Sequence, residues 1–245
     1  MEELEKTRKI VKTSFFIAVV TVAVLLVFPY DMKPKEWGIY ASSYFVTTLG
    51  LTVGGAAIGI LLGMLLAFLK FQKTNIEILD MIKDVIIDEY VDIMRGTPMV
   101  LQLLTLSFVV VILNNYWIAL IALGLNSAAY VEETIRSGIE SIDKGQMEAA
   151  RATGMPYRMA MNEIIMPQAI KNILPALLNE FINLFKETAV VGYISVVDIT
   201  MNSKSLQAAY YSVKPILFTG LVYYISVKLF SFIGKRLEMR LKEND

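Results

Sequence analysis

Polar and charged side chains recur at helical spacing in one otherwise apolar stretch of the sequence. At i, i+4, i+7 and i+8 spacing they are Asn179, Asn183, Lys186 and Glu187, which share one face of a helix. An ionisable side chain costs roughly 2.5–3.5 kcal/mol to place at the centre of a bilayer. Such a face must therefore line a hydrated cavity or a neighbouring helix. Lys186 and Glu187, with the hydroxyl of Thr188, could bind a ligand that carries both signs of charge, or they could pair structurally with neighbouring helices.

A second polar set lies within another apolar stretch and comprises Asn126, Ser127 and Tyr130. Amides and hydroxyls of this kind bind ligands, but they also join helices through hydrogen bonds inside a membrane. The spacing does not separate these two roles.

A third set, Asp88, Asp92 and Arg95, follows i, i+4, i+7 spacing just before Gly96 and Pro98. The glycine and the proline break helix regularity. The pattern therefore predicts a structural kink, with a gating role as the alternative.

Several classes of chemistry have no residues to support them here. The chain has no cysteine and no histidine, so thiolate nucleophiles, the commonest metal ligand and the usual general base are absent. Lysine plus arginine equal aspartate plus glutamate at 23 each, so no net charge attracts nucleic acid. No G-x-x-x-x-G-K-[ST] motif is present, so the chain has no P-loop for ATP. We expect neither an enzyme nor a metal site.

The elements that position these residues are predicted to be membrane-spanning helices. The chain is 56% hydrophobic with a mean hydropathy of +0.55, above a typical soluble domain. A helix needs about 20 mostly apolar residues to cross a bilayer. Six stretches qualify: 13–30, 44–69, about 88–113, 116–135, about 174–197 and about 213–233. In the second, Gly50, Gly54, Gly59 and Gly63 predict close helix packing.

The distribution of basic residues supports six spans with both termini in the cytoplasm. Six spans put sixteen of the Lys and Arg residues on the side of the termini. The opposite side receives Lys33, Lys35, Lys204 and Lys214.

The first span could be a signal peptide, but no A-x-A cleavage site follows it. We therefore expect residues 1–43 to form an uncleaved anchor and an external linker. Residues 44–237 would then form a five-helix core, and residues 238–245 a cytoplasmic tail.

The long cytoplasmic segment 137–167 is expected to be ordered. Helix formers at 146–153 precede Gly154, which suits the left-handed residue that ends a helix. Pro156 suits the first turn of a second helix, over 157–165, which Pro167 would interrupt. Ala149 and Ala150 would give the first helix a thin face for a partner's groove, although a solvated helical turn has the same spacing.

This loop and several other motifs resemble the type I ABC importer permeases, in the subfamily for polar amino acids. Glu148-Ala149-Ala150, Gly154 nearby and Pro167 further on resemble their EAA loop. Other shared motifs are Arg95-Gly-Thr-Pro98, Asn126-Ser-Ala-Ala-Tyr130, Ser141-Ile-Asp-Lys-Gly-Gln146, Asn179-Glu-Phe181 and Lys186-Glu-Thr188. The similarity covers about residues 44–237 and departs at Met166, Glu132 and the short turn near 114–117.

The resemblance implies an all-α integral membrane protein of the prokaryotic cytoplasmic membrane. It would transport an amino acid by alternating access, with the EAA loop as a coupling helix. Glu148, Ala149, Ala150 and Gly154 would couple the chain to the ATPase. The substrate candidates are Lys186, Glu187, Thr188, Asn126, Ser127 and Asn179.

The implied partners are a second permease, identical or paralogous, two cytoplasmic ATPases that hold ATP and Mg, and an extracytoplasmic binding protein. The rival hypotheses are an ion-coupled transporter that uses Glu180, Glu187 or Asp92, an intramembrane enzyme, and a membrane scaffold without transport.

Overall fold

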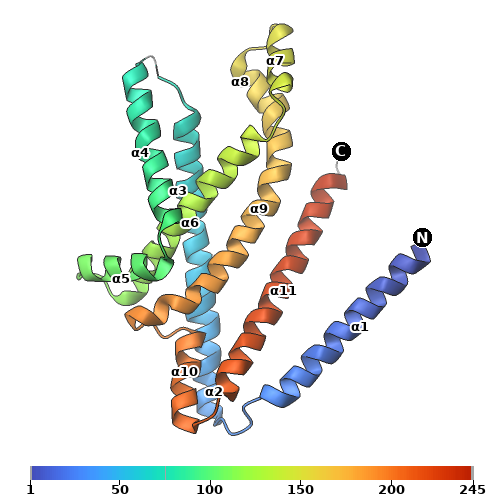
Figure 1. Cartoon of the computed structure of the whole chain (residues 1–245), viewed down its shortest axis with the longest axis vertical. Coiled ribbons are helices and arrows are strands. Elements are labelled where there is room, and N and C mark those ends of the chain that lie inside the picture. The colour runs from blue at the N-terminus through green and yellow to red at the C-terminus, as the bar shows by residue number, and fades with distance from the viewer. Residues whose placement is uncertain (1, 75, 244–245) are drawn as a thin grey trace.

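The computed structural model describes residues 2–74 and 76–243, and every regular element in that part is helical (Figure 1). The α-helices are α1 (Glu2–Val27), α2 (Pro34–Ser42), α3 (Leu49–Phe71), α4 (Glu77–Gly96), α5 (Met99–Val109), α6 (Asn115–Glu140), α7 (Lys144–Ala152), α8 (Tyr157–Ala160), α9 (Met166–Glu187), α10 (Ile199–Tyr210) and α11 (Lys214–Glu243). Two π-helical segments, η1 (Ser43–Thr48) and η2 (Met161–Ile165), and one 3₁₀ segment, η3 (Thr188–Ile194), join them.

Within the described residues, four helical stretches are long and apolar enough to cross a membrane. They are Lys6–Val27, Pro34–Phe71, Asn115–Glu140 and Lys214–Arg240, which overlap the first, second, fourth and sixth predicted spans. The second is longer than predicted, because α2, η1 and α3 form one helix that includes most of the expected external linker. Its 38 residues extend about 57 Å, well beyond about 30 Å of hydrocarbon, so it projects from the membrane.

The third and fifth predicted spans are not single α-helices. Thr97 is extended (φ −116°, ψ 142°) and Pro98 follows it, so α4 ends at Gly96 and the short α5 begins at Met99. This geometry agrees with the steric restriction that a proline places on the residue before it. The fifth predicted span comprises the end of α9 and η3, and it stops at Ser195, whose φ of 63° is left-handed. The kink predicted at Gly96 and Pro98 is thus a complete break between α4 and α5.

The α3–α6 pair forms the centre of the bundle. Gly54, Gly59 and Gly63 of α3 meet residues Leu120, Ser127 and Val131 of α6, in the same order along both helices. The two helices therefore run parallel. A Cβ atom built on any of these three glycines would lie 2.5–2.7 Å from the facing side chain, which confirms the close packing predicted from the glycine spacing.

The main hydrophobic core lies between α3, α5, α6, α9 and η3. Its fully buried members are Leu51, Leu103, Ala119, Leu123, Leu184 and Val191. α1 stands apart from this core, and the span within it has no buried residues. It contacts α11, where Phe16 and Tyr224 place their ring centroids 6.0 Å apart.

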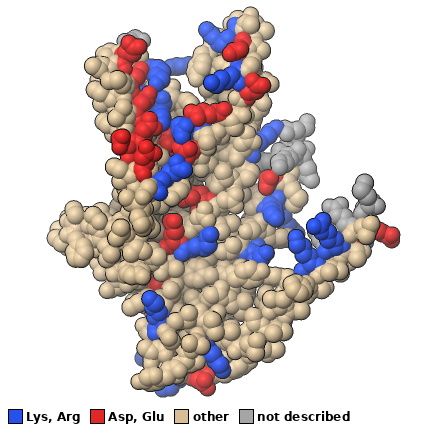
Figure 2. Space-filling view, viewed as in Figure 1, with Lys and Arg blue, Asp and Glu red and all other residues tan. Residues whose placement is uncertain are grey.

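Charged side chains are concentrated at one end of the molecule. Figure 1 shows α7, α8 and the α3–α4 turn at this end, and α2 and the α10–α11 turn at the other. Figure 2 shows that Lys, Arg, Asp and Glu crowd the first end and thin out toward the middle of the visible face. A middle with few charged side chains between two polar ends is the distribution that a bilayer favours.

Candidate coupling and substrate sites

The predicted coupling helix is α7, which stands at the charged end of the molecule (Figure 1). Asp143 caps its first turn by accepting a hydrogen bond from the Gly145 N–H at 2.8 Å. Glu148 and Ala149 are exposed, whereas Ala150 is buried at 5% exposure. The two alanines therefore do not form one thin face as predicted, because they lie about 100° apart around the helix and Ala150 points inward.

The thin exposed face of α7 is formed by other small residues. Gly145, Ala149 and Ala152 are all exposed and fall within one third of the helix circumference, with Glu148 at its edge. Nothing larger than a methyl group stands on this face, so a partner's backbone could approach α7 closely.

Gly154 ends the coupling helix in the geometry that the sequence predicts. Its φ is +88°, its N–H donates to the Arg151 carbonyl at 3.0 Å, and the Met155 N–H donates to the Ala150 carbonyl at 3.2 Å. These two bonds form a Schellman motif, which requires a left-handed residue at this position. The predicted sharp bend at Gly154 is therefore confirmed.

The second predicted helix of the loop continues into α9, so the prediction that Pro167 interrupts it is wrong. α8, η2 and α9 run unbroken from Tyr157 to Glu187. Pro167 sits in the first turn of α9, directly after the π-helical segment η2. A π-helical turn shifts the hydrogen-bond register by one residue, so the missing N–H of a proline is accommodated there. The coupling loop is thus joined to α9 by continuous helix.

The predicted substrate residues divide into two groups. On α9, Asn179 and Lys186 are exposed and Glu187 is half-buried. Asn126, Ser127 and Thr188 are buried, at 2%, 2% and 0% exposure. Only the first group is free to meet a ligand directly.

The three buried residues bond to neighbouring protein groups. The Asn126 amide donates to the Met94 carbonyl at 3.2 Å and to Gln102 at 3.0 Å, and so bridges the break between α4 and α5. The Thr188 hydroxyl donates to the Phe185 carbonyl at 2.8 Å. These contacts favour the structural role for both residues.

Ser127 positions a carboxylate that the predicted substrate set did not include. Its hydroxyl bonds the carboxylate of Glu180 on α9, and its side chain packs directly on Gly59 of α3. Glu180 is 9% exposed and lies within electrostatic reach of Glu187. The sequence carried one signal for this pair, since residues seven apart share an edge of a helix.

Tyr130 and Arg95 complete the surroundings of these two carboxylates. The Tyr130 ring lies within electrostatic reach of Glu180 and Glu187, and the Arg95 guanidinium stands 5.6 Å from its centroid. Arg95 also pairs with Glu133 at 3.4 Å. The cluster therefore combines two carboxylates, which attract a cation, with an aromatic ring whose face the Arg95 guanidinium already occupies.

Comparison with known proteins identifies the family of the chain. Residues 59–243 match the family described as "Binding-protein-dependent transport system inner membrane component". The chain is 44% identical to the arginine transport system permease protein ArtQ of Bacillus subtilis, over 81% of this chain and 90% of that protein. It is 37% identical to the putative glutamine transport system permease protein GlnP of Rickettsia typhi, over 81% of this chain and 91% of that one.

Solved structures give the same result. A crystal structure of an amino acid ABC transporter with histidines superposes with a TM-score of 0.75 at 36% identity, covering 84% of this chain and 95% of that one. An inward-facing MetNI methionine ABC transporter has a TM-score of 0.71 at 18% identity and supports the fold alone. The chain belongs to the family of binding-protein-dependent transport system inner membrane components, the membrane-spanning permease subunits of ABC transporters.

Proposed function

We propose that this chain is one of two permease subunits in an importer of a polar amino acid, driven by two ATPase subunits that bind ATP and Mg. An extracytoplasmic binding protein delivers the substrate, and both termini and α7 lie in the cytoplasm. The relatives named for arginine and glutamine support a polar amino acid. The excess of basic residues on the side of α7 supports the orientation.

One observation carries the coupling mechanism. The coupling loop and the carboxylate cluster are connected by the continuous helical stretch from Tyr157 to Glu187. When ATP draws the two ATPases together, α7 moves with the ATPase that holds its thin face. The helical connection then carries this movement to Glu180 and Glu187, so nucleotide chemistry at one end changes the site near the middle.

The substrate site is formed by the exposed face of α9 and the cluster behind it. Glu187 and Glu180 bind the ammonium group or a cationic side chain, and Lys186 binds the carboxylate. Asn179 adds an amide on the same face, while Asn126, Ser127 and Thr188 hold the helices and Glu180 in place. Because Asn179, Asn183 and Lys186 are exposed in the isolated chain, a second permease copy and a hydrated path must cover them.

The decisive experiment is uptake into proteoliposomes that contain the permease, its ATPase and its binding protein. We expect ATP-dependent, saturable uptake of at least one of L-arginine, L-glutamine and L-histidine. Glu148→Arg should reduce this uptake at least about tenfold, because a reversed charge costs a few kcal/mol at a complementary interface. The chain should remain inserted and bound to its partner permease.

The matched control is Glu77→Arg, which reverses an exposed charge on α4 near the α3–α4 turn and should leave uptake unchanged. Unchanged uptake in Glu148→Arg would refute the coupling role of α7. Uptake that follows membrane potential without the ATPase would instead support the ion-coupled hypothesis.

A further inference from the structure

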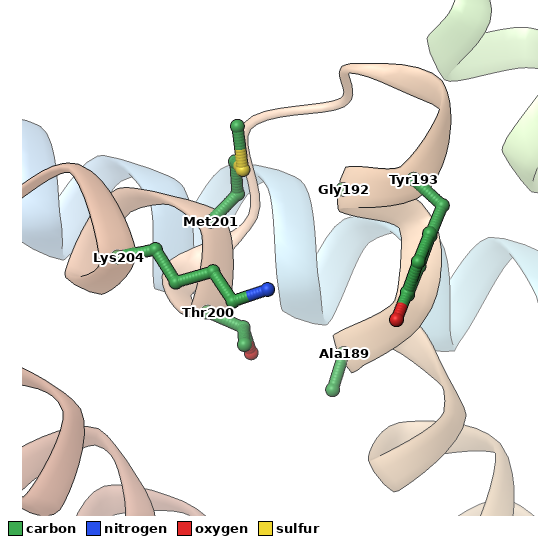
Figure 3. Close-up of a pocket in the computed structure, with 6 residues that line it drawn as sticks. All are labelled: Ala189, Gly192, Tyr193, Thr200, Met201 and Lys204. Atoms are coloured by element: carbon green, nitrogen blue, oxygen red, sulfur yellow. The ribbon is translucent and has the colours of Figure 1, made fainter.

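A small pocket opens between η3 and α10, beyond the outer end of the α9 substrate face. Ala189, Gly192 and Tyr193 line it from η3, and Thr200, Met201 and Lys204 line it from α10 (Figure 3). Its volume is about 70 Å³. A water molecule needs at least roughly 10–15 Å³ by the same measure, so the pocket has room for several waters or for a small ligand group such as a carboxylate.

The polar groups of this pocket suit an anion. Figure 3 shows the Lys204 side chain reaching across the gap toward Tyr193, with the Thr200 hydroxyl below it. The Lys204 ammonium lies 6.0 Å from the Tyr193 ring centroid, and no Asp or Glu in the described part of the chain forms an ion pair with it. An ammonium with a tyrosine hydroxyl nearby can bind a carboxylate through charge-assisted hydrogen bonds.

Local structure holds these groups in place. Asp198 caps α10 by accepting hydrogen bonds from the Thr200 N–H at 3.0 Å and the Met201 N–H at 2.9 Å. Thr200 and Lys204 then share one face of α10 at i, i+4 spacing, and Met201 lies beside this face. A Cβ on Gly192 would lie 3.2 Å from the Cβ of Met201, so the glycine allows η3 to approach this face closely.

The pocket continues the exposed polar face of α9. In a 3₁₀ helix, residues three apart lie directly above one another. Lys186, Ala189 and Gly192 are spaced in this way across the junction of α9 and η3. A ligand that follows Asn183 and Lys186 outward along α9 therefore reaches the pocket next.

We propose that this pocket is an outer subsite that binds the carboxylate of the amino-acid substrate as it enters the path. Lys204 supplies the charge and Tyr193 a hydroxyl donor, while the Thr200 hydroxyl at the pocket wall contacts the Tyr223 hydroxyl at 3.3 Å. The rest of the substrate stays outside the pocket, directed toward Glu187. The proposal rests on the proposed import function and adds a specificity residue, Lys204, that distinguishes an amino acid from an amine.

The experiment measures ligand binding to the purified permease–ATPase complex without the binding protein, which would impose its own selectivity. Because the chain has no cysteine, Ala189→Cys places one unique thiol in the pocket. We expect L-arginine to slow alkylation of this thiol by a neutral maleimide. Agmatine, which keeps the guanidinium and lacks the carboxylate, should not slow it.

In the second arm, Lys204→Gln should weaken L-arginine binding at least about tenfold, the loss of one charge-assisted bond, and leave agmatine binding unchanged. Lys204→Arg keeps the charge and should bind L-arginine within a few-fold of the native chain. Lys35→Gln, which removes an exposed external lysine outside the pocket, should have no effect.

Suppose that the native and Lys204→Gln complexes both import L-arginine and bind it with equal affinity. This result would overturn the proposed subsite but would leave the import function intact. Absence of amino-acid uptake by the native complex would overturn the import function itself. Protection of Ala189→Cys by short-chain phosphatidylglycerol but not by L-arginine would assign the pocket to a lipid phosphate and overturn the proposal.

Discussion

Glu132 is a carboxylate buried in α6 at 1% exposure. Neither of its oxygens accepts a hydrogen bond from any described residue. Lys70 and Arg136 are within electrostatic reach, but Lys70 pairs directly with Asp88 and Arg136 with Glu133 and Glu140. A buried carboxylate without a direct partner destabilises the helix bundle around it.

Replacing Glu132 by an apolar side chain of similar size should therefore stabilise the protein. We expect Glu132→Met to raise the free energy of unfolding by at least about 1 kcal/mol, because it removes an uncompensated buried charge. Thermal unfolding in detergent would measure this. Glu133→Gln, a half-buried control that breaks pairs with Arg95 and Arg136, should lower stability slightly. A lower melting temperature for Glu132→Met would mean that the carboxylate has a partner in the assembled transporter.

Asp80 stabilises the turn between α3 and α4, which lies outside the membrane-spanning segments. Both of its carboxylate oxygens accept the Thr74 N–H, at 3.0 and 2.9 Å, and Lys83 donates to one of them at 3.2 Å. Lys83 also bonds the Gln72 carbonyl. These contacts, led by the Thr74 backbone bond, hold the pKa of Asp80 below its ordinary value of 3.8.

This lowered pKa predicts the pH dependence of the turn's stability. A carboxylate with a lowered folded pKa contributes stability that is fully present above its unfolded pKa and is lost as the pH falls through the folded value. Asp80→Asn should therefore be less stable than the native chain by a constant amount above about pH 5, and the difference should shrink below about pH 4. Thermal unfolding from pH 3 to pH 7 would test this. Glu77→Gln, which removes an exposed carboxylate near the same turn, is the matched control at pH 7.

The close packing of α3 against α6 depends on the glycines of α3, which have no side chain. A Cβ on Gly63 would lie 2.6 Å from the Cβ of Val131 and 2.7 Å from the backbone oxygen of Ala128. The backbone atom cannot move aside without shifting α6. The parallel contact of the two helices is therefore set by the glycines themselves.

Gly63→Ala should separate these helices and lower the free energy of unfolding by about 1–3 kcal/mol, the usual cost of overpacking. Gly220→Ala is the matched control, since nothing lies within 4 Å of its Cβ position on α11. It should be neutral or should stabilise the protein by up to about 1 kcal/mol, because alanine favours helix. Thermal unfolding and the yield of monodisperse protein would measure both effects. Equal stability of the two variants would contradict the close packing of α3 against α6 at Gly63.

At the scale of the whole molecule, the positions of the basic residues and the path of the chain agree. Figure 1 shows α1 beginning, and α11 ending, toward the end that carries α7, so the chain crosses the molecule an even number of times. The third and fifth crossings are made by α4 with α5 and by α9 with η3 and α10. These broken crossings carry the polar residues, and backbone irregularity at such depth is tolerated only where it lines a cavity or is buried in protein.

The sequence by itself determined the helical class, the apolar stretches long enough to cross a membrane, the glycine contacts and the bend at Gly154. These features depend on hydropathy and backbone freedom, both of which act over a few residues. The sequence also located the motifs that resemble the family and from which we predict a coupling role for α7.

Only the tertiary structure decided which polar residues are exposed and which are hydrogen-bonded inside the protein. Asn126 and Asn179 are both amides on predicted spans, yet one is bonded to Met94 and Gln102 and the other is exposed. Likewise, Pro167 fits a continuous helix because η2 precedes it, and Lys204 meets Tyr193 because η3 folds against α10. Each outcome depends on groups brought close by packing between helices, which spacing along one helix does not reveal.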